Sequence, residues 1–159
     1  FSPVIARLFS PEEFGVYAMI AAMIAVFSNI SSLRYDTTVM LPIKDEDSAK
    51  LVSVSFFTAF LFSILVLILL LSTFSFFKGF YLKNGIQSIL FIVPFATWVV
   101  SFHKPINFWL SRFKKYKLIA FGKTFQGFAI AILTVSFGLL SVKEGLVLGY
   151  IGGWVLFVL

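Results

Sequence analysis

Cysteine is absent from this chain of 159 residues, and histidine occurs once, as His103. These absences exclude a disulfide framework, a thiolate nucleophile and a metal centre built from several cysteine or histidine ligands. Charged side chains are also scarce, since Asp, Glu, Lys and Arg make up 13% of the chain against about 25% in a soluble domain. The sequence therefore predicts no metal site and no cofactor.

Apolar residues dominate what is present: 60% of the chain is hydrophobic, and 22 residues are phenylalanine. A soluble domain has about 45–50% apolar residues, so this composition is typical of an integral membrane protein. The net charge of +6 does not indicate a nucleic-acid partner, because the basic residues lie in short loops between apolar runs, where they meet lipid headgroups. We expect an all-α, polytopic membrane helix bundle in contact with membrane lipids.

Apolar runs predict a short N-terminal stub and five segments that span or nearly span a bilayer. They are 1–9 (the stub), 14–41, 51–77, 86–110, 118–140 and 145–159. The first and last runs look cut, so we expect a fragment of a longer transporter-like protein, with all 159 residues in its N-terminal transmembrane lobe. The loops at 42–50 and 111–117 carry six basic residues and the other polar segments carry four, which places these two loops in the cytoplasm.

Local signals predict how individual helices begin, bend and pack. Ser10-Pro11-Glu12-Glu13 is typical of a helix start, with Ser10 and Glu13 at the two positions of a capping box. Pro94 and Pro105 predict kinks in the run at 86–110. Two overlapping GxxxG patterns predict a close helix–helix contact; they are formed by Gly145, Gly149 and Gly153.

The run at 14–41 is the one on which a functional interpretation depends. It is apolar at first and then turns polar, and we predict that it continues as one helix to Leu41. At about 100° per residue, polar side chains share one face of this helix, with Arg34 and Asp36 at its two edges; the shared face holds Ser28, Ser31, Ser32 and Tyr35. An ionisable residue below the lipid headgroups is a functional-site hypothesis by default.

Several stretches carry a resemblance to a known family. They are Ile5-Ala6-Arg7-Leu8-Phe9-Ser10-Pro11-Glu12-Glu13-Phe14-Gly15-Val16-Tyr17, Leu33-Arg34-Tyr35-Asp36, Val39-Met40-Leu41-Pro42 with the acidic loop after it, and Asn107-Phe108-Trp109-Leu110 with its basic loop. With these residues the chain resembles the N-terminal part of the polysaccharide biosynthesis/export family, the Wzx-type oligosaccharide flippases, in the superfamily that also contains the MATE exporters.

The resemblance implies two helical lobes around a central cavity and transport by alternating access. It implies a bacterial or archaeal cytoplasmic (inner) membrane and a role in the biosynthesis of lipopolysaccharide O-antigen, capsule or exopolysaccharide. The implied substrate is a polyprenyl-pyrophosphate-linked oligosaccharide, and the implied protein partners are a polysaccharide polymerase and glycosyltransferases.

A cationic cavity is the site that the residues favour. A pyrophosphate crossing a low-dielectric interior needs compensating positive charge, and the fork of an arginine matches phosphate oxygens. The predicted substrate-binding residues are Arg34, Lys104, Tyr35, Ser31 and Ser32, and the candidate for ion coupling is Asp36.

Each residue also has a plainer interpretation. Arg34 and Lys104 would snorkel to the cytoplasmic headgroups, Asp36 would balance a nearby cation, and His103 would lie at the membrane interface instead of relaying protons. Two other functions remain open: a MATE-type small-molecule antiporter, whose cavity would favour acids over arginines, and a membrane enzyme acting on the same glycolipid. An enzyme would need a constellation of catalytic groups, and Asp36 and His103 are single candidates on different helices. We therefore expect no catalytic residues and no enzyme activity.

Overall fold

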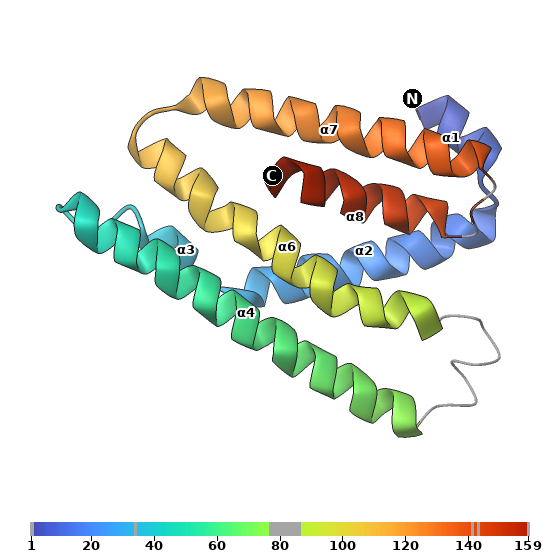
Figure 1. Cartoon of the computed structure of the whole chain (residues 1–159), viewed down its shortest axis with the longest axis horizontal. Coiled ribbons are helices and arrows are strands. Elements are labelled where there is room, and N and C mark those ends of the chain that lie inside the picture. The colour runs from blue at the N-terminus through green and yellow to red at the C-terminus, as the bar shows by residue number, and fades with distance from the viewer. Residues whose placement is uncertain (1, 34, 77–86, 141, 143, 159) are drawn as a thin grey trace. The chain divides into compact units, whose positions relative to one another are not determined.

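A computed structural model of the chain describes residues 2–33, 35–76, 87–140, 142 and 144–158 (Figure 1). Within these ranges the chain forms seven helices and no strand, which confirms the all-α prediction. The helices are α1 (Ser2–Leu8), α2 (Pro11–Ser31), α3 (Tyr35–Thr38), α4 (Asp45–Phe76), α6 (Gln87–Arg112), α7 (Tyr116–Leu139) and α8 (Gly145–Val158).

Three of the described helices, α2, α4 and α7, are long and apolar enough to cross a membrane. Helix α6 has 26 residues, but it carries His103, Lys104 and the two prolines, and it is less apolar than these three. The chain divides into two compact units, one made of Phe1–Ala22 with Lys115–Leu159 and the other of Met23–Lys114.

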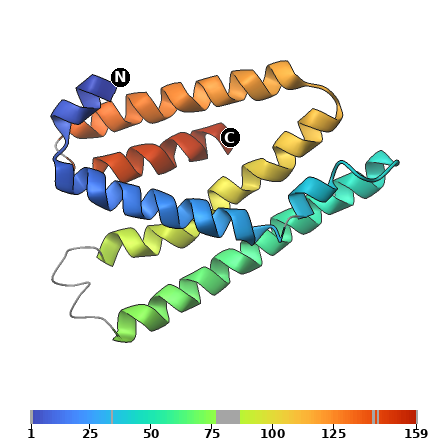
Figure 2. The ribbon, with the colours of Figure 1, turned by 180° about the vertical axis from the view of Figure 1, so that it is seen from behind.

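In the first unit, α7 and α8 form a hairpin whose two helices run side by side (Figure 2). Their backbones approach closely at the predicted GxxxG pattern. A Cβ atom added to Gly149 would lie 2.7 Å from the Cα atom of Thr134, and one added to Gly153 would lie 2.9 Å from the backbone nitrogen of Ile130. Both separations are too short for a side chain, so the prediction of a close helix–helix contact is confirmed.

The start of α2 is capped as the sequence predicts. The backbone N–H of Ser10 donates to Glu13 Oε2 at 2.7 Å, and the N–H of Glu13 donates to Ser10 Oγ at 3.3 Å. These two reciprocal bonds form a capping box, and they satisfy donors that the first turn of a helix would otherwise leave unpaired.

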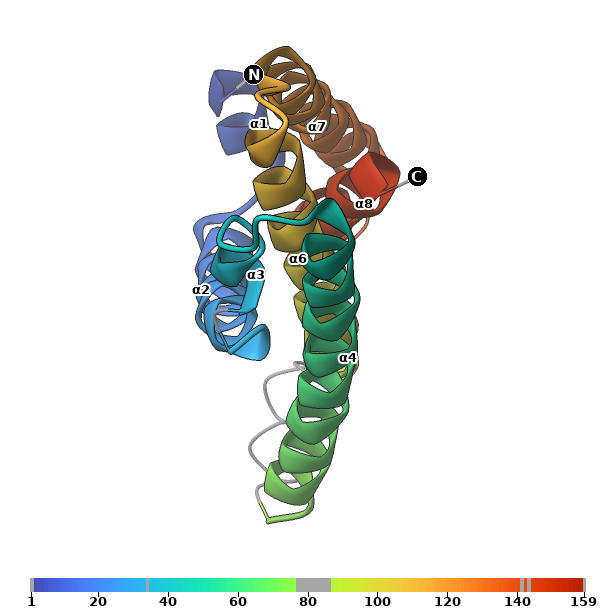
Figure 3. The same cartoon turned by 90° about the vertical axis from the view of Figure 1, so that its left-hand side faces the viewer.

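In the second unit, α4 and α6 pack against each other in antiparallel directions, and α3 lies against both (Figure 3). Small and β-branched side chains are buried on both helices, among them Ala59 and Val66 of α4 and Val93 and Ala96 of α6. The rings of Phe56 and Phe102 stack at a centroid distance of 4.0 Å and an angle of 9°. Helix α6 is bent along its length (Figure 1), as expected where proline removes a backbone donor.

The prediction of one continuous helix over 14–41 is wrong. Helix α2 ends at Ser31, Leu33 has a left-handed φ of 46°, and α3 follows as a single turn. The connection is closed by tight turns, in which the N–H of Leu33 donates to Ile30 O at 2.9 Å and the N–H of Tyr35 donates to Ser32 O at 2.8 Å. A leucine rarely adopts this conformation by itself, so contacts with the rest of the unit must hold the break.

Other helix ends also differ from the predicted spans. Helix α4 begins at Asp45 and not at Leu51, because Asp45, Glu46 and Asp47 occupy its first turn, where carboxylates interact favourably with the helix dipole. The turn predicted near 44–47 is therefore confined to the residues before Asp45. The predicted loop at 78–85 lies outside the described residues.

Candidate functional site

The broken end of α2 gathers buried polar side chains in an otherwise apolar unit. We call Ser28, Ser31, Ser32 and Asp36 the polar break. All four are buried, with Ser32 exposed by 1% and Asp36 by 6%. Burial of hydroxyl and carboxylate groups is costly unless each group finds a partner. The hydrogen-bond partners of these side chains therefore show how their burial is stabilised.

Helix α6 supplies partners for the last turn of α2. Ser31 Oγ lies 2.6 Å from Ser101 Oγ, and Ser101 Oγ donates to Thr97 O at 2.6 Å. Each hydroxyl has one proton, so both bonds form when Ser31 donates to Ser101 and Ser101 donates to Thr97 O. Ser31 Oγ is also placed to donate to Ser28 O at 3.0 Å, and this carbonyl oxygen, with two lone pairs, can accept from a second donor.

That donor is Lys104. Its Nζ donates to Ser28 O at 2.6 Å and to Asn29 Oδ1 at 2.9 Å. The last carbonyls of a helix have no intrahelical partner and form the negative end of the helix dipole, so an ammonium group there is favourable. Lys104, predicted to bind substrate, is thus engaged with the C-terminal turn of α2.

Lys104 lies about two turns, or ~12 Å, before Arg112 along α6. The headgroup regions add only about 5–7 Å on each side of the hydrocarbon core. If Arg112 marks the membrane surface, Lys104 and the polar break therefore lie in the outer part of the hydrocarbon. At this depth the two bonds of Lys104 have few competing water molecules.

We expect Lys104→Met to lower the free energy of unfolding by about 2 kcal/mol, because it removes two charge-assisted hydrogen bonds and leaves α2 without its cap. Lys123→Met is the matched control, since Lys123 lies within α7 with an exposed side chain. Thermal unfolding of both variants in the same detergent measures the difference. Equal melting temperatures would show that Lys104 does not stabilise the end of α2.

Three oxygens around the break have no hydrogen-bond partner among the described residues. They are Ser32 Oγ, Asp36 Oδ1 and Thr97 Oγ1, and each is buried. Burying an acceptor without a hydrogen-bond partner costs roughly 1–3 kcal/mol of folding free energy, and more if the acceptor is charged. Asp36 belongs to α3, which packs against α4 and α6. The region thus offers a buried carboxylate and hydroxyls whose oxygens could coordinate a cation or accept a hydrogen bond from a donor group or water.

The structure places the remaining predicted site residues differently. Arg34 lies outside the described residues. Tyr35 is 41% exposed and does not join the buried group, whereas His103 is buried in α6. Sequence reasoning missed Ser101 and Thr97, although Ser101 stands three residues before Lys104, at the spacing that puts two side chains on one face of a helix.

A second polar contact lies at the C-terminal end of α6. The Nε and Nη2 atoms of Arg112 lie 3.0 and 2.9 Å from Asp45 Oδ1, Nη1 donates to Pro42 O at 2.6 Å, and Nη2 donates to Ile43 O at 3.1 Å. These bonds tie the loop before α4 to the end of α6. They confirm that the loop beginning at Pro42 and the start of the basic loop lie at the same end of this unit.

Among the described residues, no group of three or more His, Asp or Glu side chains is placed to hold a metal ion. A family model described as polysaccharide biosynthesis protein matches residues 4–151. The chain belongs to this family. No curated protein and no solved structure matches it. Together with the three membrane-crossing candidates, the family makes this chain a multi-pass membrane protein of polysaccharide biosynthesis or export.

Proposed function

We propose that this polysaccharide biosynthesis protein flips a polyprenyl-pyrophosphate-linked oligosaccharide across a bacterial or archaeal cytoplasmic membrane. The chain would form most of one lobe of a two-lobed, MATE-like transporter that works by alternating access. The observation that supports the proposal is the polar break, where α2 ends and the buried Asp36 carboxylate and Ser32 hydroxyl each have an oxygen that finds no hydrogen-bond partner in the described part of the chain. Transporters bind substrates and coupling ions at such interrupted helices.

The break suits this task through two kinds of group. Arg34 lies between Ser32 and Asp36 in the sequence, and its guanidinium would bind the pyrophosphate, with Ser32 and the exposed Tyr35 as hydroxyl partners. Asp36 would bind a coupling cation or proton, because its buried oxygen lacks a donor among the described residues. Lys104 would act mainly by holding α2, and its bonds to Ser28 and Asn29 support this division of roles.

A leaflet assay tests the function directly. The full transporter, with both of the proposed lobes, is reconstituted into liposomes that carry a fluorescent polyprenyl-pyrophosphate oligosaccharide, and a membrane-impermeant lectin reports how much of it reaches the outer leaflet. We expect the protein to accelerate this exchange and Asp36→Asn to abolish its dependence on an ion gradient. Exchange no faster than in protein-free liposomes would contradict the proposal.

The buried Asp36 carboxylate also favours one rival, a small-molecule antiporter coupled to a cation. The same liposomes separate the two functions. An antiporter would move an organic cation against a proton or sodium gradient without moving the lipid-linked sugar. We propose transport and not catalysis in either case.

Orientation gives a further prediction. We propose that the ends of α6 and α4 joined by Arg112 face the cytoplasm, because the basic residues concentrate there. Lys114 has an exposed side chain. A cysteine introduced by Lys114→Cys should not react with an impermeant thiol reagent in intact cells, but should react with it in inverted vesicles. Lys83→Cys, predicted on the opposite side, should show the reverse. Labelling of Lys114→Cys in intact cells would contradict this orientation and support the opposite one.

A further inference from the structure

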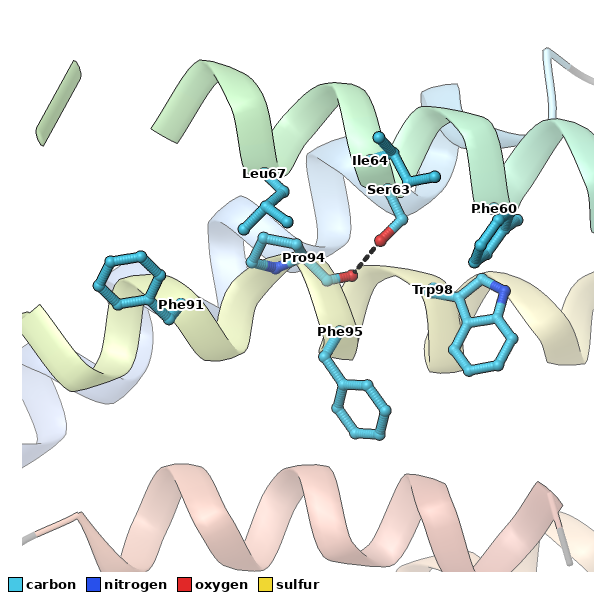
Figure 4. A pocket seen from close by; sticks show the side chains of 8 residues that line it. All are labelled: Phe60, Ser63, Ile64, Leu67, Phe91, Pro94, Phe95 and Trp98. Atoms are coloured by element: carbon cyan, nitrogen blue, oxygen red, sulfur yellow. Dashed lines mark hydrogen bonds between the residues drawn. The ribbon is translucent and has the colours of Figure 1, made fainter. Parts of the chain in front are cut away.

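An aromatic groove lies between α4 and α6, away from the polar break in sequence (Figure 4). Its volume is about 300 Å³. Four aromatic residues line it, Phe60 from α4 and Phe91, Phe95 and Trp98 from α6, together with Pro94 and aliphatic side chains of α4. We call this feature the aromatic groove.

The groove offers little to a polar ligand. Ser63 Oγ donates to Pro94 O at 2.7 Å, so its proton is already used within the wall (Figure 4). The other polar side-chain atom in the lining is the indole nitrogen of Trp98. The ring of Trp98 contacts those of Phe60 and Phe95 at centroid distances of 6.1 and 6.3 Å. Mutually packed rings beside a proline form a stiff, apolar wall, which suits a hydrocarbon chain.

The groove is continuous with the lipid-facing side of α4. Phe60 and Ile64 belong both to the groove and to a stripe of exposed apolar side chains along this helix; the other members of the stripe are Phe57, Leu61, Leu65, Ile68 and Leu69. Because α4 is apolar enough to cross a membrane, lipid chains surround this stripe and have direct access to the groove.

The dimensions favour an isoprenoid chain. At roughly 30 Å³ for each water-sized group, the groove holds about ten heavy atoms, or about two isoprene units. Phe91, Phe95 and Trp98 follow one another about every turn of α6, at rises of ~6 and ~4.5 Å, which is similar to the length of one isoprene unit. A methyl-branched chain with trigonal carbons can place a branch between successive rings, whereas a smooth acyl chain has no feature that matches their spacing.

The distribution of charge along α6 also favours an anionic lipid with its tail in the groove. The groove occupies the N-terminal half of the helix, and the cations Lys104, Arg112 and Lys114 follow towards and beyond its C-terminal end. An anionic amphiphile with its tail in the groove would therefore direct its headgroup towards positive charge. Lys104 is the nearest of these cations to the groove, about 9 Å beyond Trp98 along the helix axis.

We propose that the aromatic groove binds the isoprenoid tail of the anionic lipid-linked substrate while the headgroup is transferred at the polar break. This inference rests on the proposed function and adds a subsite for the lipid carrier. It assigns Trp98 as a contact of the tail.

Quenching of Trp98 fluorescence tests the subsite. The protein, with Trp98 as its single tryptophan, is reconstituted in bilayers of phospholipid with brominated acyl chains, which quench tryptophans that they touch. A long-chain polyprenyl phosphate is then added, and its total binding is measured separately by native mass spectrometry. We expect the brominated lipid to quench Trp98 and the polyprenyl phosphate to relieve most of that quenching.

Two controls make the result specific. A variant with Trp109 as its single tryptophan reports on α6 beyond the groove and should show no relief. Ile64→Phe fills the groove and should abolish the relief at Trp98, whereas Leu65→Phe adds the same bulk on the lipid-facing side and should not. Since both substituted side chains are exposed on α4, neither variant should impair folding.

The outcomes separate the subsite from the function. If polyprenyl phosphate binds but leaves Trp98 quenched, the groove holds bulk acyl chains and the inference is overturned while the flippase proposal stands. If polyprenyl phosphate does not bind at all, the tail subsite is overturned, and the leaflet assay decides the flippase proposal separately. Equal relief at Trp98 and Trp109, or relief that survives Ile64→Phe, would also contradict the subsite.

Discussion

Gly149→Ala should destabilise the protein by about 3 kcal/mol, because the added methyl group has no space between α7 and α8. Its Cβ atom would lie 2.7 Å from the Cα atom of Thr134 and 2.8 Å from the Thr134 nitrogen. These are backbone atoms of a neighbouring helix, so a rotamer change cannot relieve the overlap and the whole of α8 must move. Thermal unfolding in detergent, followed by circular dichroism, measures the loss.

Gly127→Ala is the matched control within the same hairpin. Nothing lies within 4 Å of the Cβ position at Gly127, which is in the middle of α7. Alanine favours a helix over glycine by about 1 kcal/mol, so this variant should be as stable as the original protein or slightly more stable. A similar loss of stability in both variants would show that the effect at Gly149 does not come from its contact with α7.

Arg34→Ala should stop surface-glycan assembly while the protein still inserts into the membrane. Removing a guanidinium that binds pyrophosphate through charge-assisted hydrogen bonds costs about 3 kcal/mol, which corresponds to a roughly hundredfold loss of affinity. Arg34 lies outside the described residues, so this expectation comes from its sequence position between Ser32 and Asp36, both buried at the polar break. Glycan display, normalised to the amount of protein in the membrane, is the measurement.

Arg34→Lys distinguishes substrate binding from a loss of charge alone. Lysine keeps the positive charge but lacks the planar fork, so it should retain part of the activity. Arg7→Ala is the control, because Arg7 is exposed at the end of α1. Normal glycan display by Arg34→Ala would show that Arg34 does not bind substrate and serves only as a topological anchor.

Features that depend on local chemistry could be predicted from the sequence. The Ser10–Glu13 capping box needs two side chains at fixed spacing, and both bonds form as expected. The glycines at 145, 149 and 153 predicted a close contact, and Thr134 and Ile130 provide it. In each case a few residues in one helix determine the outcome, so the rest of the fold adds little.

The polar break could not be predicted in this way. The run from Phe14 to Leu41 contains one glycine, Gly15, and no proline, so neither of the two strongest turn-forming residues marks a turn near Leu33. Helix α6 holds the end of α2 through Lys104 and Ser101, and this contact between distant segments decides where the helix stops. One partner of Lys104 is a backbone carbonyl, which sequence patterns do not show, and substrate binding by Lys104 stays a prediction.

The early end of α2 also fits this helix to the thickness of a membrane. With 21 residues it is about 32 Å long, close to a hydrocarbon core of ~30 Å, whereas a continuous helix over 14–41 would measure ~42 Å. A bilayer with longer acyl chains would draw the Asp36 carboxylate deeper into hydrocarbon, at a cost that grows with the mismatch. Transport in bilayers of graded acyl length should therefore be fastest near the matched thickness and slow as the bilayer thickens.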